Sequence, residues 1–213
     1  MIIESRAVPA FYKNGYVLGC ETSREGVIID PGDEVDQLID LSIKHGLSIK
    51  YILLTHAHVD HVTGVSRAKA KFGVPIGLHR ADLFLYERAP EIGPMYGLSV
   101  DALPPIDFYF DSVGPWQFGK YDMHVHHTPG HCPGGVCLQV GERGSFGKDL
   151  FVGDTLFAGS IGRTDLPGGD HETLLRSIRE VLFQFGDDAI VYSGHGPTTT
   201  IGQERRTNPF LRM

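Results

Sequence analysis

Cysteine is scarce in this chain, with only three among 213 residues, at positions 20, 132 and 137. The count is odd and no two of them form a C-x-x-C pair, which argues against a disulfide framework and against a thiolate zinc ribbon. A chain of this length buries roughly 70% of its unfolded surface and needs no covalent staples. We therefore expect an uncross-linked protein of a reducing compartment, and we predict a cytoplasmic location.

Long apolar runs are also missing, since none approaches the ~20 residues of a membrane-spanning helix. The first residues lack the basic stretch and apolar core of a signal peptide. Positive charge is outnumbered, with 19 Lys and Arg against 26 Asp and Glu, for a formal net charge of −7. Such a surface repels phosphate backbones. The sequence predicts no membrane or nucleic-acid partner, and an anionic substrate would need local positive charge such as a bound metal.

Linkers and internal repeats are absent as well, so we expect residues 1–213 to form a single domain. Short apolar runs bounded by turn residues predict strands at 16–20, 27–30, 51–54, 74–78, 108–110, 116–118, 123–127, 136–140, 150–153 and 189–192. Helical spacing of apolar residues predicts helices at 35–45, 64–72, 81–88 and 172–185. The segment 89–105, which carries Pro, Gly and Met, is expected to be a flap or surface loop. Sheets flanked by helices are the architecture that this order favours.

Histidine, by contrast, is abundant, with 11 in the chain. The strongest pattern is Thr-His-Ala-His-Val-Asp-His at 55–61, directly after the apolar strand candidate at 51–54. In an extended segment residues 56, 58 and 60 point to one side, and a turn after Asp60 would swing His61 back toward them. Imidazole and carboxylate groups suit zinc, iron or manganese. The segment therefore predicts a metal site.

Three further donors also follow strand candidates. They are His131 in a Pro-Gly-His-Cys-Pro-Gly turn, Asp154 in Gly-Asp-Thr and His195 in Gly-His-Gly. Each signal is weak alone, because a turn histidine is commonly solvated and an aspartate there is commonly a helix N-cap. Loops fixed at strand ends are where enzymes build sites. Together with the first cluster, these residues complete the set that a two-metal site needs.

In this order and spacing the motifs resemble the metallo-β-lactamase superfamily. Within it the chain is similar to the glyoxalase II (hydroxyacylglutathione hydrolase) branch, in the short bacterial type that lacks the C-terminal extension; the stretches 159–170 and 204–211 share that likeness. The resemblance implies an α/β fold, the αββα sandwich, with two mixed β-sheets face to face and helices outside. It also implies ligand sets: His56, His58 and His131 for a first metal, Asp60, His61 and His195 for a second, and Asp154 bridging the two.

The resemblance implies a hydrolase with two divalent metal ions, zinc first and iron or manganese as alternatives. A bound metal lowers the pKa of its water from ~15.7 toward ~7, which supplies a metal-bound hydroxide near neutral pH. Asp60 would orient that water or take its proton, so Asp60 and Asp154 are the catalytic candidates. A thioester suits this site, because a thiolate whose conjugate acid has a pKa near ~8.5 departs without a general acid. We therefore expect cleavage of a small glutathione-derived thioester such as S-lactoylglutathione, by a monomer or homodimer.

We expect substrate contacts in the glycine-rich loop after Asp154. There Arg163 would steer an anionic substrate or pair with Asp165 to shape the site. A loop salt bridge between the two is the competing interpretation. The larger glyoxalase II enzymes carry a Lys-bearing segment near this position and a helical extension that grips glutathione, whereas this chain has Arg163 and ends at Met213. Tyr96, in the expected flap, is a further candidate at the substrate entrance.

Alternatives stay open at this point. A glutathione persulfide dioxygenase would use a single non-haem Fe(II) at His58, His131 and Asp154, and metal content would distinguish it from a two-metal hydrolase. A metallo-hydrolase of another ester, lactone or amide is a second alternative. A non-catalytic metal-binding module is a third, although none of the seven donors is missing.

Overall fold

The computed structural model describes residues 1–9, 11–110 and 114–212. The chain divides into two compact units, the first made of residues 1–113 and 117–121 and the second of residues 114–116 and 122–213. The described residues form two six-stranded sheets, with strand orders β1-β2-β3-β4-β5-β6 and β14-β13-β10-β9-β8-β7, and a small two-stranded ribbon, β11-β12. Both large sheets mix parallel and antiparallel pairs, which confirms the predicted α/β class with two mixed sheets.

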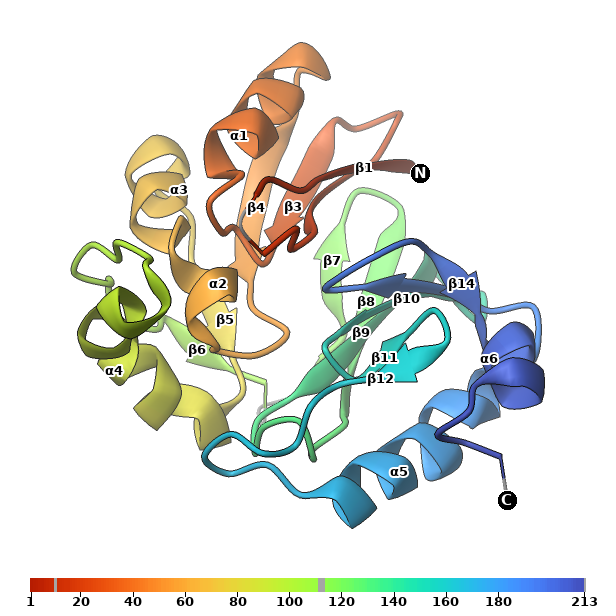
Figure 1. The fold of residues 1–213 in the computed structure, drawn as a ribbon. Coiled ribbons are helices and arrows are strands. Elements are labelled where there is room, and N and C mark those ends of the chain that lie inside the picture. The colour runs from red at the N-terminus through yellow and green to blue at the C-terminus, as the bar shows by residue number, and fades with distance from the viewer. Residues whose placement is uncertain (10, 111–113, 213) are drawn as a thin grey trace. The chain divides into compact units, whose positions relative to one another are not determined.

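The first sheet and its helices are built from the N-terminal half (Figure 1). In chain order the elements are β1 (Ile2–Arg6), β2 (Gly15–Gly19), β3 (Glu25–Ile29), α1 (Val35–Lys44), β4 (Ser48–Leu53), α2 (Val59–Val62), α3 (Val65–Phe72), β5 (Ile76–Leu78), the 3₁₀ turn η1 (Arg80–Asp82), α4 (Leu83–Ile92), the 3₁₀ turn η2 (Gly93–Tyr96) and β6 (Phe108–Tyr109).

Strands β3 to β6 are parallel, so helical crossovers must connect them. Helix α1 connects β3 to β4 and packs on β2, and its apolar residues join a buried cluster that includes Val17, Ile28 and Leu38. Because β3 and β4 are parallel neighbours, their carboxyl ends emerge at one sheet edge. The N–H of Asp30, just past β3, donates to the carbonyl of Leu53 at the end of β4 at 3.0 Å. The chain after each strand therefore starts from the same place.

The second sheet is built from the C-terminal half. Its elements are β7 (Trp116–Phe118), β8 (Tyr121–His127), β9 (Val136–Glu142), β10 (Asp149–Gly153), β11 (Leu156–Phe157), β12 (Ser160–Ile161), α5 (His171–Glu180), the 3₁₀ turn η3 (Leu182–Phe185), β13 (Ile190–Ser193), β14 (Thr199–Thr200) and α6 (Ile201–Thr207).

Strands β10 and β13 are parallel neighbours, with Gly153 opposite Ser193. The N–H of Gly194 donates to the carbonyl of Gly153 at 2.8 Å, so the residues after both strands leave at the same edge. The apolar face of α5, with Leu174 and Ile178, closes the core over these strands. The loops that follow β10 and β13, which are far apart in sequence, therefore both start from this core.

Several sequence-based boundaries need correction. The predicted helix at 81–88 continues to Ile92 through Pro90, and Gly93–Tyr96 forms a 3₁₀ turn, so the first part of the expected flap is helical. Pro90 lies in the last turn of α4, where it has no N–H to donate to the carbonyl of Tyr86. The predicted helix at 172–185 is divided into α5 and η3, and the strand predicted at 74–78 begins only at Ile76.

Some elements were not predicted. Strand β1 has mixed polarity and half-exposed side chains, as expected of an edge strand. The short helix α6 is marked by its N-cap, since Thr200 Oγ1 accepts a hydrogen bond from the N–H of Gln203 at 3.2 Å. Among the described residues, the helices are all too short or too polar to cross a bilayer.

A buried carboxylate on α6 generates the first prediction. Glu204 is fully buried and accepts hydrogen bonds from the Thr199 hydroxyl at 2.6 Å, the Gly159 N–H at 2.8 Å and the Asn208 side-chain amide at 2.8 Å. In Glu204→Gln the new amide N–H₂ would face at least one of these donors. We expect the free energy of unfolding to fall by about 1–3 kcal/mol in urea titrations. Glu180→Gln, on the exposed end of α5, is the control, and an equal loss in both variants would contradict the assignment.

Candidate metal centre

The first donor set lies in unit 1, between β4 and α3. The structure brings together four side chains of the histidine-rich segment, which are His56, His58, Asp60 and His61. The ring of His56 lies 4.0 Å from the ring of His61 and 5.0 Å from that of His58, measured between centroids. Nε2 of His61 lies 3.8 Å from Oδ2 of Asp60. The Nε2 atoms of the three histidines are buried, so this is not a solvated polar loop.

The backbone of this segment bends earlier than expected. His58 is extended, with φ −67° and ψ 151°, and is the N-cap of α2, which carries Asp60 and His61. The N–H of His61 donates to the carbonyl of His58 at 3.0 Å. The prediction of one extended stretch from 56 to 60 is therefore wrong, because helical backbone starts at Val59. The extended part presents His56 and His58, and the helical part presents Asp60 and His61.

A carboxylate that sequence reasoning missed supports this segment. Asp30 is buried and accepts hydrogen bonds from the Thr55 N–H at 2.7 Å, the Thr55 hydroxyl at 2.6 Å and Nδ1–H of His61 at 3.0 Å. With the proton on Nδ1, the lone pair of His61 is on Nε2, the atom that would bind a cation. Its signal was present in the sequence: Asp30 is the polar last residue of the strand candidate at 27–30, whose other residues are apolar.

The same carboxylate acts on His56 through one hydroxyl. A carboxylate only accepts, so the Thr55 hydroxyl gives its proton to Asp30, and its oxygen accepts from Nδ1–H of His56 at 3.1 Å. Asp30, His56 and His61 also offer donor atoms within 4.8 Å of one another. Since Asp30 already accepts three hydrogen bonds, we assign it the orientation of the two histidines rather than the binding of an ion.

The second donor set lies in unit 2. His131 comes from the turn before β9, Asp154 from the end of β10 and His195 from the end of β13. Oδ2 of Asp154 lies 3.6 Å from Nε2 of His131 and 3.4 Å from Nε2 of His195. Three segments far apart in sequence therefore converge on one carboxylate oxygen.

These separations fit a cation better than a hydrogen bond. An ordinary N–H···O contact is about 2.9 Å between heavy atoms. Two donors that each lie ~2.1 Å from one tetrahedral ion are roughly 3.4 Å apart. The spacings of His131 and of His195 from Asp154 are close to that value. Asp154 thus stands where a carboxylate could be shared by two ions, one next to each histidine.

His131 is oriented by main chain. Its Nδ1–H donates to the carbonyl of Arg163 at 2.7 Å, which leaves the lone pair on Nε2 toward Asp154. The loop reaches this position because residue 162 is glycine: a Cβ there would overlap the carbonyl oxygen of Asp154 and press on Cβ of His131. Sequence reasoning selected Arg163 for its side chain and missed its carbonyl.

The side chain of Arg163 pairs with Asp165. Nε and Nη2 of Arg163 donate to the two carboxylate oxygens of Asp165, each at 2.7 Å. These bonds hold the pKa of Asp165 at about 2, although both side chains are largely exposed. Tyr96 ends η2 in unit 1, with its side chain 45% exposed. Within unit 2 the structure therefore brings Arg163 and Asp165 together, and within unit 1 Tyr96 lies on a surface turn.

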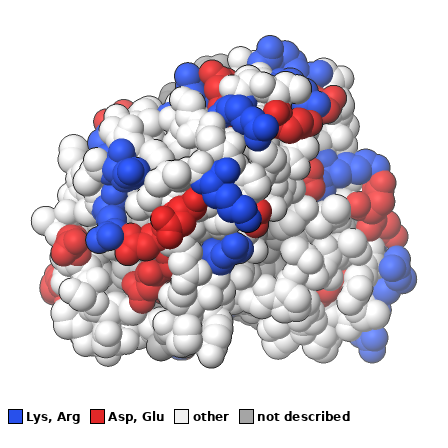
Figure 2. All heavy atoms as spheres, turned by 90° about the horizontal axis from the view of Figure 1, so that it is seen from above, with Lys and Arg blue, Asp and Glu red and all other residues white. Residues whose placement is uncertain are grey.

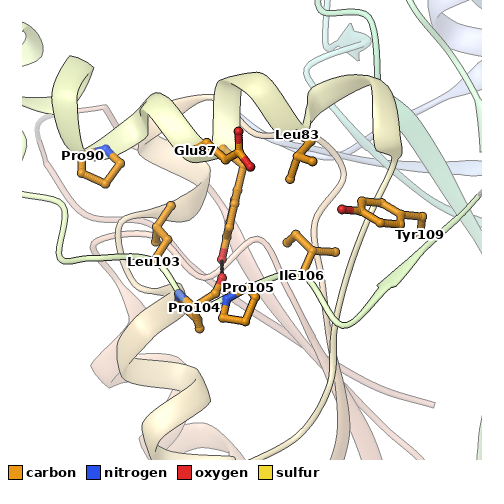
Figure 3. Close-up of a pocket in the computed structure, with 9 residues that line it drawn as sticks. Leu83, Glu87, Pro90, Leu103, Pro104, Pro105, Ile106 and Tyr109 are labelled. Atoms are coloured by element: carbon orange, nitrogen blue, oxygen red, sulfur yellow. Dashed lines mark hydrogen bonds between the residues drawn. The ribbon is translucent and has the colours of Figure 1, made fainter.

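Unit 1 also holds a cavity of about 410 Å³ beside α4 (Figure 3). The hydroxyl of Tyr86 donates across it to the carbonyl of Pro104 at 2.8 Å, and burial raises the pKa of that tyrosine. The cavity is lined by residues with mostly apolar side chains and one carboxylate, that of Glu87: Leu83, Tyr86, Glu87, Pro90, Leu103, Pro104, Pro105, Ile106 and Tyr109. Asp82, just before α4, accepts from the N–H of Ala57 at 3.1 Å. The helix along this cavity is thereby tied to the histidine segment.

The charged side chains on the surface do not form a patch of one sign on the face shown in Figure 2. On the face shown in Figure 2, basic and acidic side chains are interspersed over a mostly uncharged background. Oppositely charged neighbours include the exposed pairs Arg67–Asp36 and Arg206–Asp187. A broad basic stripe would be the footprint of a phosphate backbone, and this face has instead the pattern of a solvated surface.

The orienting role of Asp30 generates the second prediction. In Asp30→Asn one oxygen becomes an amide N–H₂, which cannot accept from the Thr55 hydroxyl or from His61. We expect affinity for Zn²⁺ to fall about 10–100-fold, the usual effect of removing a partner of a ligating histidine. Competition with a chromophoric chelator measures it. Asp107→Asn is the matched control, because Asp107 likewise accepts from a backbone N–H, that of Ile76, and from a side chain, Lys69. Equal affinities for wild type and Asp30→Asn would refute the role.

Known proteins resemble this chain along its whole length. It is 42% identical over 214 residues to "Hydroxyacylglutathione hydrolase GloC" of Haemophilus influenzae, which covers 99% of this chain and 98% of that protein. Among solved structures, "BLEG-1 B3 metallo-beta-lactamase" superposes with a TM-score of 0.89 at 37% identity and covers 100% of both chains. "TTHA1623 in a di-iron-bound form" gives a TM-score of 0.82 at 37% identity, covering 98% of this chain and all of the other.

The family assignment rests on these relatives and on a direct match. Residues 8–195 match the family described as "Metallo-beta-lactamase superfamily". That range contains all seven predicted donors, from His56 to His195. Metal binding through histidine and aspartate is what this fold implies, and the described residues supply those donors in both units. The chain belongs to the metallo-β-lactamase superfamily and is a metallo-hydrolase of that family.

Proposed function

We propose that this protein is a metal-dependent thioesterase that hydrolyses a hydroxyacylglutathione such as S-lactoylglutathione. The observation that carries the proposal is the position of Asp154, whose Oδ2 is near Nε2 of both His131 and His195 at a spacing suited to shared divalent ions. The identity of 42% to a hydroxyacylglutathione hydrolase supports the substrate class. The reducing cytoplasm, where glutathione thioesters occur, is the location that goes with it.

The two donor sets would serve one binuclear centre. His56, His58 and His131 would hold one ion, Asp60, His61 and His195 the other, and Asp154 both. The family match supports this, since it runs through both units from residue 8 to residue 195. For the same reason we regard residues 1–213 as one functional domain. Zinc is the first candidate, and the di-iron relative makes iron the second.

When bound, such ions would lower the pKa of coordinated water from ~15.7 toward ~7 and polarise the substrate carbonyl. The protein's own groups prepare that chemistry. The carboxylate of Asp60 would orient the attacking water or take its proton. Asp30 and the Arg163 carbonyl keep the Nδ1 protons in place on His61 and His131. The departing thiolate, with a conjugate-acid pKa near ~8.5, needs no proton from the enzyme.

Arg163, Asp165 and Tyr96 are the proposed substrate contacts. The guanidinium of Arg163 is already paired with Asp165, so an anionic substrate would compete with that carboxylate. This competition limits how much Arg163 contributes to substrate binding. Removing Asp165 should reveal that contribution as a change in KM. Tyr96 has an exposed aromatic ring and hydroxyl that could contact the substrate.

Metal removal gives the third prediction. Stripping the protein with a chelator should reduce S-lactoylglutathione hydrolysis at least about 100-fold, because unassisted water is a poor nucleophile. Activity should return on adding Zn²⁺, Fe²⁺ or Mn²⁺, with about two ions per chain by elemental analysis. Thermal melts of the stripped protein control for unfolding. Full metal loading without thioester cleavage would remove the proposed substrate, and one iron per chain with oxygen uptake on glutathione persulfide would establish the dioxygenase.

A β-lactam is the second candidate substrate, because the chain superposes over its full length on a protein named as a B3 metallo-β-lactamase. Amide cleavage needs a proton for the leaving nitrogen, and the described donor set contains no dedicated acid for it. Assaying a chromogenic cephalosporin beside the thioester ranks the two. We expect kcat/KM for the thioester to be the larger.

The Arg163–Asp165 pair gives the fourth prediction. Arg163→Met should raise KM for S-lactoylglutathione about two- to fivefold, the range of one exposed charge contact. Its kcat should change little, because the carbonyl that orients His131 is retained. Asp165→Asn should shift KM in the opposite direction by releasing the guanidinium. A shift of KM in the same direction in both variants would mean that the pair only shapes the loop.

A further inference from the structure

A fully buried ion pair lies next to the loop that follows β3. Nζ of Lys13 is 2.5 Å from Oε1 of Glu34, and the side chains are only 2% and 1% exposed. Lys13 also donates to the main-chain carbonyl of Asp30, and Glu34 Oε1 accepts from the N–H of Gly32 at 2.9 Å. Burying two charges is expensive unless their geometry and remaining hydrogen bonds are satisfied. Here the remaining bonds all go to one short loop, residues 30–34.

That loop contacts the metal-binding segment at separate points. The Asp30 carboxylate accepts from Thr55 and His61. The carbonyl of Pro31 accepts from the N–H of Gly64, which lies between α2 and α3, at 3.0 Å. Gly32 lies so close to α2 that a Cβ would overlap the carbonyl oxygen of Asp60, and the same Cβ would also meet Cε of Lys13. A displacement of the loop would therefore displace Asp60 and His61.

The loop conformation itself needs support. Asp30 has φ +49°, a left-handed backbone that an L-residue with a side chain rarely adopts. In this conformation its carbonyl points to the Lys13 ammonium and its carboxylate to Thr55 and His61. Strained backbone persists only where its surroundings hold it in place. The buried ammonium provides that restraint on one side, and the hydrogen bonds of the carboxylate provide it on the other.

We propose that Lys13 and Glu34 are positioning residues that hold the Asp30–Glu34 loop so that Asp60 and His61 bind their metal ion. The inference rests on the ligand assignment of the proposed function. It assigns the pair no contact with substrate, because the Lys13 side chain is buried beneath the loop. Its effect should be larger on the ion held by Asp60 and His61, since the loop contacts α2 and His61 directly. The loop reaches His56, a ligand of the other ion, only through the Thr55 hydroxyl.

The test is the double variant Lys13→Met/Glu34→Gln. It removes both charges together and so leaves no isolated buried ion, while the glutamine oxygen still accepts from Gly32. Titration with Zn²⁺ against a chromophoric chelator should show one of the two sites weakened about tenfold, the lower end of the range for partners of ligating histidines. The other site, whose His56 depends on the loop only through the Thr55 hydroxyl, should weaken clearly less. In metal-free protein, ¹⁵N NMR should show His61 losing its uniform Nδ1–H tautomer.

Lys69→Met is the matched control. Lys69 also donates to a main-chain carbonyl, that of Val74, and to a carboxylate, that of Asp107, but these bonds support β5 and the chain before β6. Both zinc affinities should be unchanged in this variant. If the double variant does not fold, Glu34→Asp provides the comparison, because it keeps both charges but shortens the side chain that contacts Lys13 and Gly32. A smaller loss is expected at the same site.

The positioning role would be overturned if both zinc affinities of the double variant equalled those of wild type and the His61 tautomer were unchanged. The proposed function would then remain intact. Equal weakening of both sites would overturn it as well, because it would indicate general loosening of the fold. A wild-type protein that binds fewer than two ions would overturn the ligand assignment, and the inference with it.

Discussion

The buried carboxylate of Asp30 is the interaction on which the histidine segment depends. It joins the end of β3 to the segment after β4 with three hydrogen bonds. Through the Thr55 hydroxyl and directly, it assigns the proton to Nδ1 of both His56 and His61. A histidine that binds a metal through Nε2 needs its other nitrogen held in this way. One side chain that donates nothing to an ion thus determines what two neighbouring rings can do.

In the second unit, the group that orients the metal-binding histidine is a weaker hydrogen-bond acceptor. His131 donates to the neutral carbonyl of Arg163 rather than to a carboxylate. A charged partner raises the basicity of an imidazole more than a carbonyl does. His61, which donates directly to the Asp30 carboxylate, should therefore be a stronger electron donor than His131. The two ions could then differ in affinity even with equal numbers of ligands. The cause would be that His61 donates to a carboxylate and His131 to a carbonyl.

Much of the site could be predicted because its donors share one local rule: each follows an apolar strand. Parallel neighbours such as β3 and β4, or β10 and β13, end at the same sheet edge. That rule also applied to Asp30, but a single aspartate before Pro-Gly looks like an ordinary turn. The helical start at Val59 was not predictable either, because the stretch from 55 to 61 has no helical apolar periodicity. Edge strand β1 and helix α6 depend on packing and capping, which short sequence windows show poorly.

Arg163 illustrates what a sequence cannot reveal about a functional loop. Its side chain attracted the prediction, and that side chain is engaged with Asp165. Its carbonyl, which every residue has, orients His131. The position of that carbonyl depends on Gly162, whose missing Cβ lets the loop approach Asp154. The residue identity that matters most in this loop is therefore the glycine, because only the absence of a side chain allows the backbone to become part of the site.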